Sequence, residues 1–96
     1  MNDLQQILMK LKESKPYLRS KYGVKELAVF GSYARDEQEA SSDVDILVTI
    51  DQPLGLEFVD LAIELETLLQ QKVNLVSRGG IKSRYFEENK RDLRYA

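Results

Sequence analysis

Residues 25–50 read KELAVFGSYARDEQEASSDVDILVTI, and this stretch decides how the chain is organised. An apolar run ends at a Gly-Ser pair, a polar segment follows, and a second run alternates between polar and apolar residues. Short runs rich in Val, Ile and Phe, bounded by polar segments, are typical of β-strands. The pattern predicts strands at 25–30 and 43–50. Between them, residues 32–38 predict a short helix capped by Ser32.

Two amphipathic helices are expected outside these strands. The first covers 3–14, where apolar residues recur at helical spacing, and Pro16 predicts a break before a short segment that ends near Tyr22. The second covers 56–70 and carries its apolar residues on one stripe. That stripe consists of Phe58, Leu61, Ala62, Leu65, Leu68 and Leu69.

The remaining sequence predicts a third strand, a turn and a last helix. VNLV at 73–76 is the strand, 78–80 is the turn, and 81–91 is the helix, whereas the final DLRYA has no clear assignment. The order of helices and strands predicts an α/β or α+β fold with a sheet in the middle. The length of 96 residues predicts one domain, 1–96.

The composition excludes several kinds of chemistry. The chain has no histidine and no cysteine, so it can form no Ser-His-Asp triad, cysteine nucleophile, His/Cys zinc site or disulfide. A net charge of -2 gives no general attraction to nucleic acid or to an anionic membrane. No signal-peptide pattern or long apolar stretch occurs, and we expect a cytoplasmic protein without direct nucleic-acid binding.

The Gly-Ser pair is a candidate phosphate site. A strand that runs into Gly31-Ser32 and then into a helix presents backbone N–H groups, which favour an anion such as phosphate. Glycine lets a ligand approach the backbone closely, and serine adds a hydroxyl. A P-loop is excluded, because no G-x-x-x-x-G-K-[ST] occurs. The alternative is that Ser32 only caps a helix.

Two aspartates follow ten residues after the serine. Asp43 and Asp45 are two apart on the second strand, which places them on one face about 6.5–7 Å apart. Their repulsion is relieved if a divalent cation such as Mg²⁺ lies between them, since Mg²⁺ is commonly held by one or two carboxylates and substrate phosphates. The alternative is a solvated strand start. Together, turn and carboxylates are the minimum needed to bind a nucleoside triphosphate with Mg²⁺.

The spacing G-S-(x)10-D-x-D resembles the signature of the DNA polymerase β-like nucleotidyltransferase superfamily, and AVFGSYARDEQEASSDVDILV resembles its minimal nucleotidyltransferases. The resemblance covers most of the chain and implies a small mixed sheet flanked by helices. It implies that Gly31 and Ser32 contact the triphosphate of ATP and that Asp43 and Asp45 hold Mg²⁺. Arg35, one turn after the serine, is expected to meet a phosphate or a partner.

The resemblance also implies a partner and a reaction. Minimal nucleotidyltransferases are often encoded beside a HEPN-domain toxin, a ribonuclease, and such pairs act as toxin and antitoxin. The antitoxin is understood to transfer AMP from ATP to a tyrosine of the toxin, which disables it. The expected function is therefore that of a protein adenylyltransferase with a cognate HEPN-domain toxin as partner, as a homo- or hetero-oligomer.

One position departs from the family pattern. Family members usually carry a third catalytic carboxylate where this chain has Asn74, whose carbonyl can touch a metal but cannot take a proton. General-base help is worth about 10²–10⁴-fold, although a tyrosine with a pKa near 10 is easier to deprotonate than a sugar hydroxyl. Three hypotheses stay open: an active transferase using Asp43, Asp45 and Asn74, an antitoxin that acts by binding alone, and a stand-alone nucleotidyltransferase on a small molecule or RNA.

Overall fold

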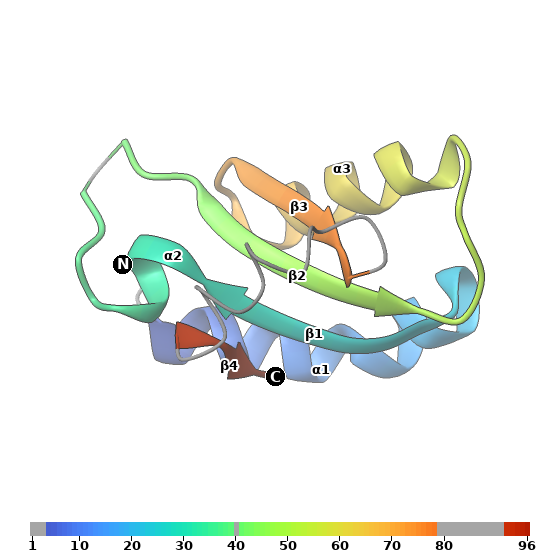
Figure 1. Ribbon diagram of the computed structural model, residues 1–96, viewed down its shortest axis with the longest axis horizontal. Coiled ribbons are helices and arrows are strands. Elements are labelled where there is room, and N and C mark those ends of the chain that lie inside the picture. Colours follow the sequence, from blue (N-terminus) through green and yellow to red (C-terminus); the bar gives the residue numbers. More distant parts are fainter. Residues whose placement is uncertain (1–3, 40, 79–91) are drawn as a thin grey trace.

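The computed structural model describes residues 4–39, 41–78 and 92–96, and these ranges form a mixed sheet flanked by helices (Figure 1). The expected fold class is confirmed. The expected helix over 81–91 lies outside the described residues. In chain order the elements are α1 (Leu4–Tyr22), β1 (Val24–Phe30), α2 (Gly31–Ala34), β2 (Val44–Ile50), α3 (Glu57–Leu69), β3 (Val73–Ser77) and β4 (Arg94–Tyr95). Within those ranges, no helix is long and apolar enough to span a bilayer.

The sheet has the strand order β3-β2-β1-β4. β1 runs antiparallel to β2 and to β4, while β2 and β3 are parallel and are joined through α3. A parallel pair requires such a crossover, because the chain must return to the edge where the first strand began. The central strand β2 therefore has a hydrogen-bonded neighbour on both sides.

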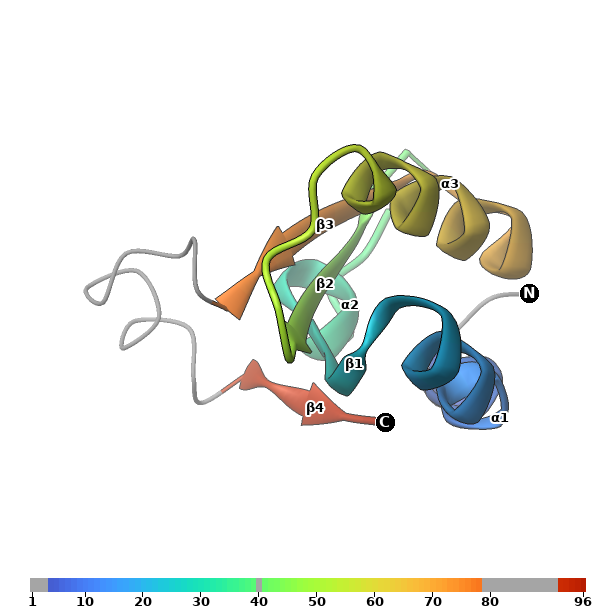
Figure 2. The same cartoon turned by 90° about the vertical axis from the view of Figure 1, so that its right-hand side faces the viewer.

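Both long helices cover the same face of the sheet (Figure 2). The main core lies between this face and the helices, and β2 contributes Val44, Ile46 and Val48 to it. On the opposite face, Leu47 forms a smaller cluster with Ala28 and Phe30. The alternation expected for 43–50 is thus confirmed, and it places Asp45 on the face that carries neither α1 nor α3.

Pro16 does not break the first helix as the sequence predicted. α1 is continuous from Leu4 to Tyr22, with Pro16 exposed inside it. A proline in a helix interior costs about 3 kcal/mol, because it lacks an N–H and crowds the preceding turn. Beyond it, Leu18 and Tyr22 are buried in the core, and each buried large side chain contributes about 1.5–3 kcal/mol. Their combined burial offsets the cost of the proline.

One other local prediction was also wrong, and the segment without an assignment forms a strand. The helix expected over 32–38 is a single turn, α2, which begins one residue earlier at Gly31, and its N-cap position is Phe30, with no side-chain cap. Ser32 is therefore not the capping residue. The unassigned C-terminal residues form β4, where Tyr95 pairs with Ala28, and the amide of Ala96 donates to the carbonyl of Leu27.

Candidate functional site

Asp45 lies at the centre of the candidate site. In the register of the sheet it pairs with Phe30 of β1 on one side and with Asn74 of β3 on the other. The amide Nδ2 of Asn74 donates a hydrogen bond of 3.1 Å to Oδ1 of Asp45. Asn74 therefore lies directly beside Asp45, and the contact joins residues 29 positions apart.

Gly31 packs directly against the other oxygen of Asp45. Its φ is +73°, a left-handed conformation that side chains rarely adopt. A Cβ added to Gly31 would overlap Oδ2 of Asp45 and lie 3.0 Å from the carboxyl carbon. The backbone turn at Gly31-Ser32 thus approaches the carboxylate as closely as it does because position 31 has no side chain. The antiparallel pairing of β1 with β2 places this turn beside Asp45, because Phe30 pairs with Asp45 in the register.

Asp43 immediately precedes β2 and is exposed, whereas Asp45 is half-buried. Burial raises the pKa of Asp45, and the charge of Asp43 raises it further, while the hydrogen bond from Asn74 and the charge of Arg35 lower it. The negative charge of Asp43 therefore acts on Asp45. A cation between them would relieve both the burial of charge and the repulsion.

Arg35 lies close enough to influence Asp45, but its guanidinium is paired elsewhere. Nε lies 3.1 Å from Glu37, and an Nη atom lies 3.3 Å from Asp92, just before β4. Sequence reasoning missed Asp92, because the C-terminal residues carried no strand pattern that would have placed them beside β1. The hydrogen bond that Arg35 donates to Asp92 raises the pKa of Arg35, which is a cation under all ordinary conditions.

The donor set suits a hard divalent ion. Asp43 and Asp45 offer carboxylate oxygens, and Asn74, with its amide nitrogen turned to Asp45, offers a carbonyl oxygen. The described part of the chain contains no group of three or more Asp, Glu, His or Cys side chains that could enclose a metal. Such an incomplete set fits Mg²⁺, which keeps waters and takes ligands from substrate phosphates. The residues therefore fit the ion that the sequence predicted.

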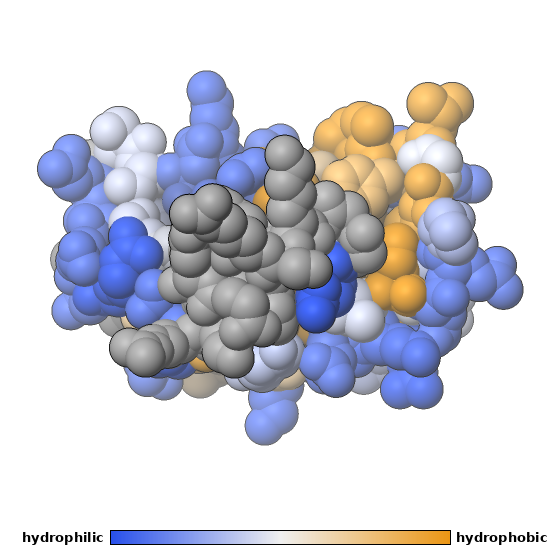
Figure 3. Space-filling view, viewed as in Figure 1, coloured by the Kyte–Doolittle hydropathy of each residue, from blue (hydrophilic) through white to orange (hydrophobic). Residues whose placement is uncertain are grey.

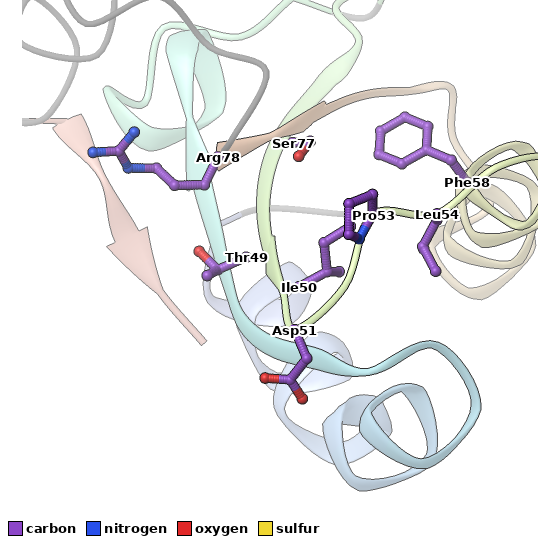
Figure 4. Close-up of a pocket in the computed structure, with 8 residues that line it drawn as sticks. All are labelled: Thr49, Ile50, Asp51, Pro53, Leu54, Phe58, Ser77 and Arg78. Atoms are coloured by element: carbon purple, nitrogen blue, oxygen red, sulfur yellow. The ribbon is translucent and has the colours of Figure 1, made fainter.

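A pocket of about 430 Å³ lies at the opposite end of β2. Figure 4 shows Phe58, Pro53 and Leu54 on its α3 side and Arg78 on the side of β3. Ile50 lines this pocket and is five residues from Asp45, about 16 Å along the strand. Apolar side chains also gather over this end of the molecule (Figure 3), where Leu56 is 85% exposed. This pocket is not part of the carboxylate site.

Residues 11–95, which span both the Gly-Ser turn and the carboxylates, match the nucleotidyltransferase domain family. The chain belongs to this family. It is therefore a nucleotidyltransferase domain, as the Gly-Ser turn and the carboxylate pair predicted. The match extends through β4, the strand that the sequence pattern did not reveal.

Comparison with individual proteins is more specific than the match to the family. The protein adenylyltransferase MntA of Thermococcus cleftensis is 44% identical over 84 residues, which cover 86% of this chain and 85% of MntA. A solved structure described as a candidate minimal nucleotidyltransferase has a TM-score of 0.79 and 33% identity, over 97% of this chain and 95% of that chain. The structure of a toxin-antitoxin with AMP-PNP has a TM-score of 0.65 and 26% identity, over 77% of this chain and 61% of that one.

Proposed function

We propose that this nucleotidyltransferase is an antitoxin that transfers AMP from Mg-ATP to a tyrosine of a cognate HEPN-domain toxin. The observation that carries the proposal is the convergence of Gly31, Asp45 and Asn74 in one contact cluster on the sheet. The similarity to MntA, a protein adenylyltransferase, supports a protein as acceptor. The similarity to a toxin-antitoxin structure with AMP-PNP supports an ATP-like donor and a toxin partner.

In this proposal the chain's own residues bind and orient the triphosphate. The backbone of Gly31 and the hydroxyl of Ser32 contact the β- and γ-phosphates, which the close packing of the turn on Asp45 brings next to the metal ligands. Asp43 and Asp45 hold Mg²⁺. When bound, Mg²⁺ supplies charge that stabilises the transferring phosphate and the leaving pyrophosphate.

Asn74 acts in this proposal as a positioning residue. Its hydrogen bond fixes the carboxylate of Asp45, and its amide cannot take the proton of the acceptor. A tyrosine loses its proton far more readily than an aliphatic hydroxyl, so it suits a site without a general base. The chemistry of the site and the proposed acceptor are therefore consistent.

The test is a search of the neighbouring reading frames for a HEPN-domain protein, followed by measurement of its intact mass after incubation with the chain, Mg²⁺ and ATP. We expect the partner to gain one or more AMP masses, and Asp43→Ala to abolish the gain while the two proteins still bind. An unchanged partner mass with the wild-type chain would contradict transferase activity.

A second candidate function is neutralisation by binding alone, and Asn74 in place of a carboxylate favours it. In that case protection against the toxin survives Asp43→Ala, and the two proteins co-purify without any gain of mass. Protection against the toxin is lost instead when an apolar contact surface is changed. The exposed Val59 and Ile63 of α3 offer one such surface. The net charge of -2 gives no support to a stand-alone enzyme acting on RNA.

A further inference from the structure

The order of the strands places different surfaces on the two sides of Asp45. Gly31 and Ser32 follow β1, whereas Asn74 is on β3, and β2 lies between these strands. Lys72 directly precedes β3, and its carbonyl accepts a hydrogen bond of 2.9 Å from the amide of Val44. The residues between α3 and β3 therefore lie beside the start of β2, on the side away from the Gly-Ser turn, and Asp43 lines the same hollow as Lys72.

The proposed transfer of AMP requires that the acceptor and the leaving pyrophosphate lie on opposite sides of the α-phosphorus. The attacking and leaving oxygens are roughly in line across the phosphorus. If Gly31-Ser32 holds the β- and γ-phosphates, the bond from the α-phosphorus to pyrophosphate breaks toward β1. The new bond, from the tyrosine oxygen to the α-phosphorus, then forms from the side of β3. The phenol proton passes to solvent, because Asn74 cannot take it.

A polar hollow lies on this second side. It has a volume of about 380 Å³ and continues into a shallow, open surface that shares three of its residues, Gln70, Gln71 and Lys72. We call the two together the Lys72 groove. Besides the shared residues, it is lined by Ser41, Ser42 and Asp43 at one end and by Ile63, Glu66 and Thr67 at the other.

The groove carries groups suited to a polypeptide. Lys72 is exposed and forms no ion pair within the described ranges. The amide nitrogen of Gln71 donates to the hydroxyl of Tyr33, while its buried Oε1 lacks a hydrogen-bond partner among the described residues. The exposed side chains of Gln70 and Lys72 offer polar contacts to a segment bound in the groove. Lys72 would meet a carboxylate or a carbonyl of the same segment.

We propose that the Lys72 groove binds the segment of the partner protein that carries the acceptor tyrosine, with an acidic residue of that segment against Lys72. This inference rests on the proposed function and adds the acceptor site to it. Lys72 is then a specificity-determining residue for the protein acceptor and has no part in binding ATP.

The test compares Lys72→Glu with Lys12→Glu, which makes the same charge change at an exposed lysine of α1. AMP transfer is measured by mass while the concentration of the HEPN-domain partner or of ATP is varied. We expect Lys72→Glu to raise the KM for the partner about tenfold or more, as loss of an interfacial charge pair does. Its KM for ATP and the KM values of Lys12→Glu are expected to stay at wild-type levels.

Each other outcome has a distinct meaning. If the wild-type chain transfers no AMP, the proposed function fails and the acceptor site fails with it. If it transfers AMP but Lys72→Glu behaves like Lys12→Glu, the acceptor site alone is overturned. A raised KM for ATP in Lys72→Glu would assign the groove to the nucleotide and would also overturn the inference.

A binding readout that does not depend on turnover uses the absence of native cysteine. Lys72→Cys and Lys12→Cys, each labelled with a thiol-reactive photo-crosslinker, are irradiated with the partner. We expect crosslinks from position 72 near the modified tyrosine and none from position 12. Equal crosslinking from both positions would contradict the acceptor site.

Discussion

At the scale of single residues, the site depends on the absence of a side chain at position 31. We expect Gly31→Ala to abolish AMP transfer and to destabilise the fold by about 1–3 kcal/mol, because the new methyl group overlaps Asp45 and the φ of +73° is strained for alanine. The measurements are transfer by mass and unfolding by urea.

Gly55→Ala is the matched control for this substitution. Its Cβ would lie 3.6 Å from Oε2 of Glu57, an ordinary contact, and it is not among the residues with a positive φ. We expect Gly55→Ala to keep both transfer and stability near wild-type values. If it lost as much transfer as Gly31→Ala, the contact with Asp45 would not be the cause.

Asn74→Asp tests how the site balances charge. The substitution replaces the donor that holds Asp45 by a third carboxylate, so we expect a loss of about 1–2 kcal/mol of stability without Mg²⁺. We expect added Mg²⁺ to restore that loss, and the transfer rate to rise if the new carboxylate acts as a base, by at most about 10²–10⁴-fold.

Thermal unfolding with and without Mg²⁺ measures the first effect. Gln52→Glu makes the same amide-to-acid change at an exposed loop position and should show no such dependence on Mg²⁺. A loss of stability in Asn74→Asp that is equal in Mg²⁺ and in chelator would argue against a cation between these side chains.

At the scale of elements, α1 and α3 are joined by a polar cluster around Glu64. Its carboxylate accepts hydrogen bonds from Tyr22 and, at 2.8 Å, from Tyr17, and it lies 3.2 Å from Nζ of Lys21. The hydrogen bond from Tyr22 lowers the pKa of Glu64. Tyr17 and Lys21 lower it further, whereas burial raises it. Burial and Glu64 raise the pKa of Tyr22 to about 12.

These shifts predict how stability depends on pH. A lowered carboxyl pKa stabilises the fold above the ordinary value of 4.5, and this contribution is lost as the pH falls through the folded value. A raised tyrosine pKa stabilises it below 10.0, and this contribution is lost as the pH rises through about 12. We expect Glu64→Gln to cost about 1 kcal/mol at neutral pH and to flatten the acid limb.

Urea unfolding between pH 2 and pH 7 tests this (the range spans the ordinary carboxyl value). Asp60→Asn, which removes an exposed carboxylate from the same helix, serves as the control and should keep the acid limb. An acid limb in Glu64→Gln as steep as that of the wild type would mean that Glu64 does not link α1 to α3.

The elements also show what the sequence could and could not predict. The spacing of apolar residues correctly predicted α3, β1, β2 and β3, because each of these elements forms by burying apolar side chains. The predicted break at Pro16 was wrong, because the prediction considered the local free-energy cost of proline without the burial of Leu18 and Tyr22 in the core. β4 has two residues and forms by pairing with β1, so no local sequence pattern could predict it.

The site was predictable for a related reason. The ten-residue spacing between Ser32 and Asp43 is a sequence feature, and the antiparallel pairing of β1 with β2 turns it into a contact between Gly31 and Asp45. The pairing of Asp92 with Arg35 and the position of Lys72 beside the start of β2 were not predictable in this way, because each depends on which elements lie side by side at an edge of the site.

At the scale of the whole molecule, the C-terminal residues are tied to the site through Arg35. Its pair with Asp92 links the segment after α2 to the start of β4. The Arg35 side chain is 40% exposed, and ion pairs of this kind contribute about 0–1 kcal/mol. A phosphate close to Arg35 would make a stronger, charge-assisted hydrogen bond, so little energy holds Arg35 on Asp92 when ATP is present.

This competition predicts opposite effects for the two partners. We expect Arg35→Ala to raise the KM for ATP about tenfold through loss of a charge-assisted bond. We expect Asp92→Asn to leave that KM unchanged or to lower it, because it removes the group that competes for the guanidinium. Lys25→Ala breaks an exposed ion pair with Asp51 and serves as the control for losing a surface pair. If Asp92→Asn raised the KM for ATP as much as Arg35→Ala does, Arg35 would act by holding β4 in place, and its part in binding phosphate would be excluded.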